Sequence, residues 1–168
     1  MTILELNRID HGEFVRVIGP VFEHSPWIAE AAFEQRPFST VETLHQAMCD
    51  VVKKSDEEKH MALIRAHPDL VGRAALAGTL TSQSTSEQAA AGLDKLLPEE
   101  IRLFQEYNAA YKEKFGFPFI ICARLNKKQA ILEGIARRKK NSREQEIKTA
   151  LEEIFKIAEL RLRDLIND

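Results

Sequence analysis

The stretch from His67 to Gln88, HPDLVGRAALAGTLTSQSTSEQ, gathers the residues of this chain that could carry acid–base chemistry. It opens on His67 followed directly by Pro68, and it closes on a hydroxyl-rich run that leads to Glu87. Proline disfavours helical backbone in the residue before it and is common at the first helical position. His67 is therefore expected at a bend, near the start of a helix that Pro68 opens. A helix N-terminus disfavours imidazolium, which predicts a neutral His67 that can give or take a proton near neutrality.

Glu87 lies three residues after Ser84, which is the spacing of an N-terminal capping box. Both residues have a purely structural interpretation, in which His67 and Glu87 do no more than cap helices. The chain has four other histidines, and these show neither an HExxH pattern nor a Cys/His cluster: His11, His24, His45 and His60. No dedicated metal site is expected.

The elements that must position these residues are helical almost throughout. Residues expected to cap helices precede most of the apolar repeats: Asp10, Ser39, Ser55, Ser84, Asn126 and Ser142. One stretch breaks the pattern. The sequence FPFII at 117–121 is aromatic and β-branched, carries Pro118 and follows Gly116, so it is expected to be a buried extended segment. The predicted fold class is all-α, a single compact domain over residues 1–168 with about eight helices and this one extended segment.

The final helix, opened by Ser142, places an arginine on its apolar side. One stripe at helical spacing is formed by Ile147, Leu151, Ile154, Ala158, Leu162 and Leu165. At about 100° per residue, Arg161 falls about 40° from the centre of that stripe, whereas Arg163 falls on the opposite side. An inward arginine must find a carboxylate, carbonyl oxygens or an anionic ligand, because an unpaired buried charge is costly. The structural alternative is an arginine that snorkels at the edge of the stripe.

Composition excludes several classes of function. A net charge of -2 gives no electrostatic basis for binding nucleic acid or an anionic membrane. No stretch approaches the length of a membrane span, and the N-terminus lacks the basic and apolar regions of a signal peptide. Cys49 and Cys122 lie in apolar surroundings without metal-type spacing, so free buried thiols and a cytoplasmic location are expected.

A neutral histidine, a carboxylate and an arginine suit proton transfer on a small anionic substrate. No Gly-rich loop follows a strand, which removes the usual nucleotide signatures. Ser84 lacks the G-x-S-x-G frame of a serine nucleophile, and capping is its commoner role. Taken alone, these residues predict an acid–base site for a small polar anion and leave the substrate open.

Three blocks carry a resemblance to a known family: HPDLVGRAALAGTLTSQSTSEQAAAGLD, NAAYKEKFGFPFII and IAELRLR, in this order. Together with SPW at 25–27, they closely resemble the decarboxylases of 2-oxo-4-hydroxy-4-carboxy-5-ureidoimidazoline (OHCU) in uric acid degradation. The resemblance covers nearly the whole chain. It implies an all-helical, cofactor-free and typically homodimeric enzyme that converts OHCU to (S)-allantoin and carbon dioxide.

The resemblance also implies roles for individual residues. The family's catalytic histidine and glutamate match His67 and Glu87, and its substrate-binding arginine matches Arg161. Further pocket positions match Pro68, Ser84 and Gln88, and the main chain near Phe119 and Ile121 matches the piece that faces the ligand. Glu87 would then hold or deprotonate the substrate hydroxyl, with His67 beside the departing carboxylate and Arg161 at ring or ureido carbonyls.

Two other classes of function stay open at this point. A cofactor-free hydrolase or isomerase of another ureide could use His67 and Glu87 equally well. A non-enzymatic helical interaction module would be favoured if Arg161 and Glu87 merely pair with each other.

Overall fold

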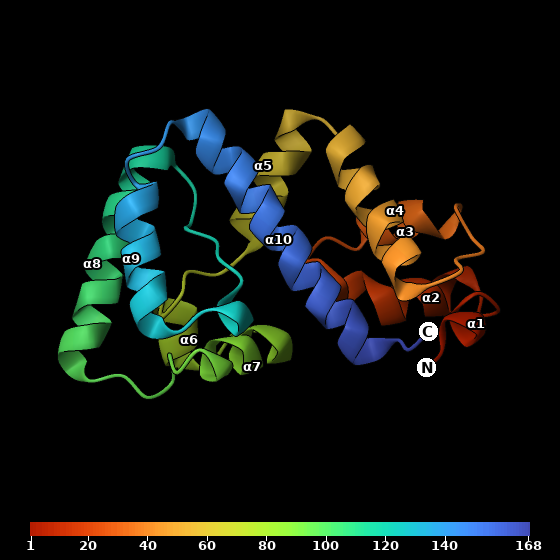
Figure 1. The fold of residues 1–168 in the computed structure, drawn as a ribbon, viewed down its shortest axis with the longest axis horizontal. Coiled ribbons are helices and arrows are strands. Elements are labelled where there is room, and N and C mark those ends of the chain that lie inside the picture. Colours follow the sequence, from red (N-terminus) through yellow and green to blue (C-terminus); the bar gives the residue numbers. More distant parts are fainter. The chain divides into compact units, whose positions relative to one another are not determined.

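The computed structural model describes all 168 residues and contains helices but no strands, so the all-α prediction is confirmed. The ten α-helices are α1 (Ile3–Leu6), α2 (His11–Ile18), α3 (Trp27–Phe33), α4 (Val41–Lys54), α5 (Glu57–Ala66), α6 (Arg73–Ala77), α7 (Ser82–Ala90), α8 (Pro98–Phe115), α9 (Lys128–Arg138) and α10 (Arg143–Leu165). Two 3-10 helices, η1 (Gly19–Val21) and η2 (Ala123–Leu125), complete them (Figure 1). The count exceeds the expected eight partly because α1 is a single turn, too short to show a periodicity.

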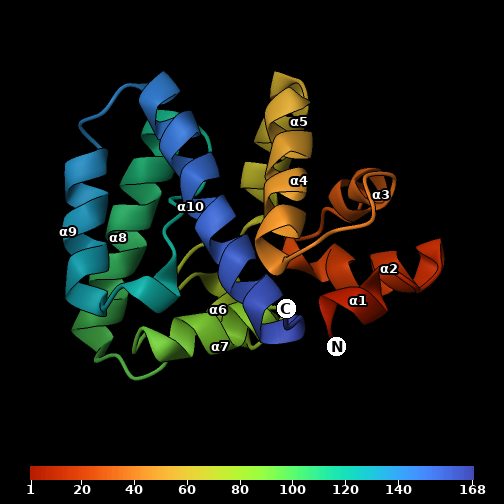
Figure 2. The ribbon, with the colours of Figure 1, turned by 45° about the vertical axis from the view of Figure 1, so that its right-hand side comes forward.

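The first of two compact units comprises residues 1–66 and 155–168. Within it α2 packs on α3, and α3 packs on α4. Its core consists of fully buried side chains that include Phe14, Ile28, Leu44 and Met48. The main chains of Ile3 and Asn167 are hydrogen-bonded at 2.8 Å, and those of Asn167 and Met1 at 2.9 Å. The two chain ends therefore lie side by side, as Figures 1 and 2 both show.

The second unit comprises residues 67–154. Within it α8 lies beside α9, and α7 packs against η2 (Figure 2). Its core is aromatic, because the Tyr111 ring has three phenyl rings around it at centroid distances of 4.6 to 6.1 Å: Phe115, Phe117 and Phe119. Residues 117–121 are extended and mostly buried, as the sequence predicted, and they bring two of these rings into the core.

Some helices begin at the predicted cap, and three begin one to three residues away from it. Asp10 and Ser142 accept hydrogen bonds from the main chain three residues on, as expected of caps. Three caps were placed wrongly: Thr40, Asp56 and Thr81 accept these bonds in place of Ser39, Ser55 and Ser84. In each case two or more polar residues adjoin, and any of them can serve as a cap. Asn126 does not cap α9, and its amide donates to the Cys122 carbonyl instead.

Helix α10 buries part of the predicted stripe, with Ile154, Ala158 and Leu162 fully covered. Leu165 is exposed, whereas Glu146, Ala150 and Glu153 are buried. Arg161, with 3% of its surface exposed, lies within the buried arc, as its position on the stripe predicted. The difference follows from three inward charged residues, which a stripe of apolar residues alone cannot reveal.

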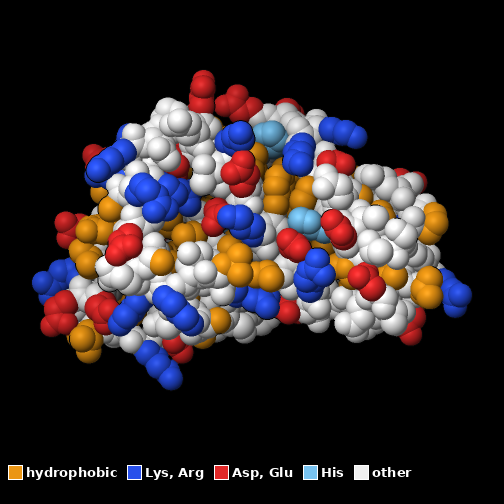
Figure 3. All heavy atoms as spheres, in the orientation of Figure 1, with side chains coloured by type: hydrophobic (Ala, Val, Ile, Leu, Met, Phe, Trp, Pro, Cys, Tyr) orange, Lys and Arg blue, Asp and Glu red, His pale blue; other side chains and the backbone are white.

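None of the helices has both the length and the apolar composition that a membrane span requires. On the face shown in Figure 3, acidic and basic side chains are interspersed.

Candidate active site

The segment 67–72 connects α5 to α6 without helical structure. Pro68 does not open a helix, because α6 begins only at Arg73, so the expected helix start at His67 is wrong. His67 is instead the first residue after α5 and is buried, with 8% of its surface exposed. The bend itself is confirmed, but the argument for a neutral imidazole from a following helix N-terminus no longer applies. Pro68 is half-buried in the same segment.

Val71 gives this segment an unusual backbone. Its φ of 54° lies in the left-handed region, which is rare for a β-branched residue. Such conformations persist only where the surroundings enforce them, and they cluster at functional sites. The surroundings here are side chains that bond the segment from two helices.

Gln88 of α7 bonds the segment on one side. Its side-chain oxygen accepts from the Val71 N–H at 3.1 Å, and its amide group donates to the Asp69 carbonyl at 3.5 Å. From α8, the Asn108 amide donates to the Leu70 carbonyl at 2.6 Å, and Lys112 pairs with the Asp69 carboxylate at 2.9 Å. The segment that carries His67 is therefore held at three successive residues.

Helix α7 carries the other predicted residues of the hydroxyl-rich run. Its cap is Thr81, so Ser84 and Glu87 do not form the expected capping box, and Ser84 donates its main-chain N–H to the Thr81 hydroxyl at 3.2 Å. Ser84 and Gln88 lie one turn apart and are both buried, whereas Glu87 is half-buried. Glu87 therefore projects from the middle of α7 rather than from its first turn.

The pKa of the Cys122 thiol responds to the charge of Glu87. Burial raises the pKa of this thiol, and the carboxylates of Glu153 and Glu87 raise it further. Both carboxylates thus lie close enough to act on Cys122, next to the extended segment. The structure brings together, within one unit, α7 and the C-terminal end of that segment.

The extended segment bonds to the protein along one edge. The Ile120 carbonyl accepts from Arg138 at 2.6 Å, and the Cys122 N–H donates to Glu153 at 3.2 Å. The main-chain groups of Phe119 and Ile121 make no hydrogen bond within the chain. Because a buried main-chain polar group needs a partner, these groups are suited to an external donor or acceptor.

Sequence reasoning missed the buried cluster behind this segment. Arg138 bonds Glu146 at 2.9 Å, and the same carboxylate accepts from the Tyr111 hydroxyl. The guanidinium of Arg138 also lies over the Phe119 ring, 4.3 Å from its centroid. In the sequence, Arg138 belongs to the basic run RRKK at 137–140, which is typical of a solvated helix end. A usable signal existed, because Glu146 and Glu153 are seven residues apart and share one helical face.

Arg161 belongs to the first unit, and its inward orientation is confirmed. Its guanidinium pairs with the Glu23 carboxylate at 2.9 Å, with both side chains buried. The carbonyls of Pro20 and Val21 lie at 3.4 Å from the same nitrogen. The partner found is therefore a carboxylate with supporting carbonyls. Glu23 was also missed, and nothing in the spacing of its neighbours marks it.

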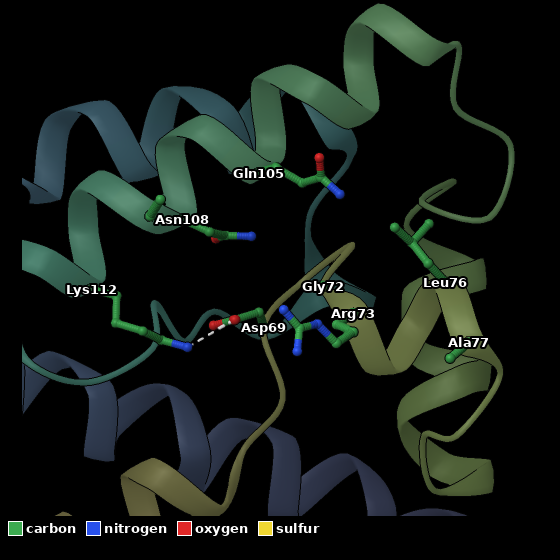
Figure 4. Close-up of a pocket in the computed structure, with 9 residues that line it drawn as sticks. Asp69, Gly72, Arg73, Leu76, Ala77, Gln105, Asn108 and Lys112 are labelled. Atoms are coloured by element: carbon green, nitrogen blue, oxygen red, sulfur yellow. Dashed lines mark hydrogen bonds and ion pairs between the residues drawn. The ribbon is translucent and has the colours of Figure 1, made fainter.

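A cavity of about 620 Å³ lies beside the 67–72 segment in the second unit (Figure 4). It is lined by residues of that segment, α6 and α8, including Asp69, Arg73, Leu76 and Asn108. None of the predicted site residues lines it. One side-chain oxygen of Asp69 and that of Asn108 are buried without a partner in the protein, and a cavity of this size has room for water there.

Comparison with known proteins identifies the family. The sequence model of OHCU decarboxylases matches residues 7–163. The chain belongs to the OHCU decarboxylase family. It is 43% identical over 169 residues to the OHCU decarboxylase of Mus musculus, covering 99% of this chain and 93% of the relative. It is 42% identical over 164 residues to that of Haloferax volcanii, covering 98% and 95% of the two chains.

Two further proteins are similar to this chain over nearly its whole length. A uric acid degradation bifunctional protein of Bacillus subtilis is 39% identical over 167 residues, and the matched stretch is 33% of its length. The crystal structure of an (S)-allantoin synthase superposes with a TM-score of 0.80 at 30% identity, covering 99% of this chain and 54% of the other. The present chain thus spans about half of that synthase chain.

Proposed function

We propose that this chain decarboxylates OHCU to (S)-allantoin and carbon dioxide in urate degradation, acting as a cofactor-free carboxy-lyase. The observation that carries the proposal is the family match over residues 7–163, with relatives of that name at about 40% identity over nearly the whole chain. A related OHCU decarboxylase was crystallised in the presence of (S)-allantoin, with a TM-score of 0.67 at 25% identity, covering 83% of this chain and 89% of the other.

The arrangement in the second unit supports this chemistry. His67 is a buried imidazole on the segment 67–72, which side chains of α7 and α8 hold by hydrogen bonds and an ion pair. Glu87 is a half-buried carboxylate on α7. The free main-chain groups of Phe119 and Ile121 offer both donors and acceptors, which suits a ureide crowded with amide N–H and C=O groups. Pro68, Ser84 and Gln88 lie on the same two elements and are proposed to complete the binding surface.

The mechanism follows from the substrate. OHCU carries a hydroxyl and a carboxylate on one ring carbon, next to a C=N bond that can accept electrons. Glu87 holds or deprotonates the hydroxyl while His67 lies beside the departing carboxylate. The carbon–carboxylate bond breaks, its electron pair moves into the C=N group, and carbon dioxide leaves. Protonation of the resulting enol-like intermediate from one face then gives the S product.

Arg161 is proposed to anchor ring or ureido carbonyls, giving orientation rather than proton transfer. The family resemblance and the inward burial of Arg161 support this role. Its ion pair with Glu23 fixes the direction of the guanidinium.

The deciding experiment uses OHCU freshly generated from urate by urate oxidase and the following hydrolase. The circular dichroism of allantoin is followed with and without the protein. Rapid growth of the S signal is expected, and His67→Ala should reduce turnover by about 10²-fold or more while keeping a helical far-UV spectrum. Racemic product at the spontaneous rate would remove the proposed function. Release of a product without carbon dioxide would instead indicate a ureide hydrolase.

A homodimer and a cytoplasmic location are part of the same proposal. Family resemblance supports the dimer, and two buried free cysteines are compatible with a reducing compartment. Light scattering at micromolar concentration tests the first, because a monomer mass would contradict it. Fractionation of native cells tests the second.

A further inference from the structure

The extended segment has two chemically different edges. In extended backbone, the N–H and C=O of one residue point to the same side, and those of the next residue point to the opposite side. Ile120 and Cys122 therefore share one edge, and Phe119 and Ile121 share the other. The first edge is bonded to charged side chains, whereas the second makes no hydrogen bond within the chain.

Arg138 of α9 is one of the two groups on the bonded edge. Its guanidinium donates to the Ile120 carbonyl at 2.6 Å and to Glu146 at 2.9 Å, and it is 6% exposed. The Glu146 carboxylate is fully buried and also accepts from Tyr111 and Asn141. The Glu146 carboxylate accepts hydrogen bonds from three side chains, and its contact with Arg138 holds the guanidinium in place. Arg138 is therefore a rigid donor for the Ile120 carbonyl.

Glu153 of α10 is the second group. Its carboxylate accepts the Cys122 N–H at 3.2 Å, and the side chain is 8% exposed. The segment is therefore bonded by a buried cation at Ile120 and by a buried anion at Cys122. The donor Arg138 is matched to a carbonyl and the acceptor Glu153 to an N–H, so together the two contacts hold this edge of the segment towards α9 and α10.

We infer that Arg138 and Glu153 are positioning residues that lock the register of residues 119–122 and so aim the free Phe119 and Ile121 edge at the substrate. The inference rests on the proposed function. A slip of one residue would turn the opposite edge outward, because successive residues of extended backbone alternate. The free groups of Phe119 and Ile121 are about 7 Å apart, two residues of extended chain, which spans a ureide with several amide groups.

Glu153→Leu is the primary test, with Glu153→Gln as the conservative control. The glutamine retains an oxygen that accepts the Cys122 N–H, whereas the leucine does not. We expect Glu153→Leu to raise the KM for OHCU about tenfold or more, with kcat within about threefold of the unsubstituted enzyme. The Kd of (S)-allantoin, measured by calorimetry, should rise in parallel. Glu153→Gln should restore both constants to within about threefold.

A second pair of variants tests the other contact. Arg138→Lys keeps the positive charge but lacks the fork that reaches Glu146 and the Ile120 carbonyl together, so KM is expected to rise by a similar factor. Tyr111→Phe is the matched control, because it removes a bond to Glu146 and leaves the segment contacts in place. It should lower the melting temperature without changing KM.

The outcomes separate this inference from the proposed function. If the unsubstituted enzyme neither turns over OHCU nor binds (S)-allantoin, the proposed function fails. If it does both, but Glu153→Leu and Arg138→Lys keep its KM and Kd, the positioning role is overturned. If Glu153→Leu does not fold, Arg138→Lys against Tyr111→Phe decides the question alone.

Discussion

The side-chain oxygen of Gln88 accepts a hydrogen bond from the main-chain N–H of Val71 at 3.1 Å, and Val71 has a φ of 54°. Left-handed backbone costs a non-glycine residue about 1–2 kcal/mol, and a β-branched side chain makes it less favourable still. Val71 is nevertheless buried, so its side-chain packing and the Gln88 contact together hold it there. The strained residue lies four positions after His67, on the same segment.

Gln88→Leu should therefore lower both stability and activity. The Val71 N–H would lose its partner in a buried place, which costs about 1–3 kcal/mol of unfolding free energy, measured by urea denaturation. Relaxation of the segment should also reduce kcat/KM. Gln83→Leu, on the same helix but outside these contacts, is the control and should do neither. Equal effects of the two substitutions would mean that the contact between Gln88 and Val71 does not hold the segment.

Gly72→Ala tests the same segment from its other end. A Cβ on Gly72 would lie 2.7 Å from the Asp69 Cβ and 3.2 Å from the Asp69 carbonyl oxygen, so the segment would have to move. We expect kcat/KM to fall about tenfold or more, since His67 would move with it. Gly12→Ala, whose Cβ would meet only a side-chain oxygen at 3.4 Å, should leave activity unchanged and act as the control. Unchanged activity in Gly72→Ala would mean that the segment tolerates displacement.

The Arg161–Glu23 ion pair changes what Arg161→Ala should do. The family resemblance implies that Arg161→Ala weakens substrate binding. The variant would also leave Glu23 buried without this guanidinium, at a cost of about 3–5 kcal/mol of stability. Thermal denaturation should detect this loss. The double variant Arg161→Met with Glu23→Gln should recover much of the stability and none of the substrate affinity. Recovery of affinity in the double variant would leave Arg161 with only a structural role.

The thiol of Cys49 predicts a pH dependence of stability. Burial raises its pKa to about 12, whereas an unfolded cysteine titrates near 8.5. The folded chain keeps this proton while the unfolded chain loses it. The contribution to stability is therefore complete below about pH 8.5 and is lost as the pH rises towards 12. Urea denaturation from pH 8 to 11 should show a falling free energy of unfolding, with a shallower slope in Cys49→Ala. Identical slopes would contradict the shifted pKa.

Much of the fold was readable from the sequence because its signals are local. Helical periodicity, caps such as Asp10 and Ser142, and the aromatic break at 117–121 each depend on neighbours within a few residues. The bend at His67 also follows from Pro68 alone. The error came one step later, because a proline can end one helix without starting another. Residues 69–72 form a turn that contains the left-handed Val71, and α6 begins only after it, at Arg73.

The partners of buried charges could not be read in the same way. Arg161 was identified as inward from its position on α10, but Glu23 lies 138 residues away in the chain. Arg138 and Glu146 are only eight residues apart, yet each looks like an ordinary surface charge until a neighbouring helix covers it. Tertiary packing decides which charged side chains are covered. The buried ion pairs and hydrogen bonds behind the candidate site therefore appear only in the three-dimensional structure.

The main-chain bonds of Asn167 with Met1 and Ile3 hold the two ends of the chain together. A domain whose ends meet can be inserted into, or fused to, a larger protein without stretching either host or guest. In a bifunctional relative, the matched stretch makes up a third of the chain, so a domain similar to this one is covalently joined there to further protein. For the same reason, a short linker across the ends should permit a circular permutant, opened for example in the exposed turn before α8.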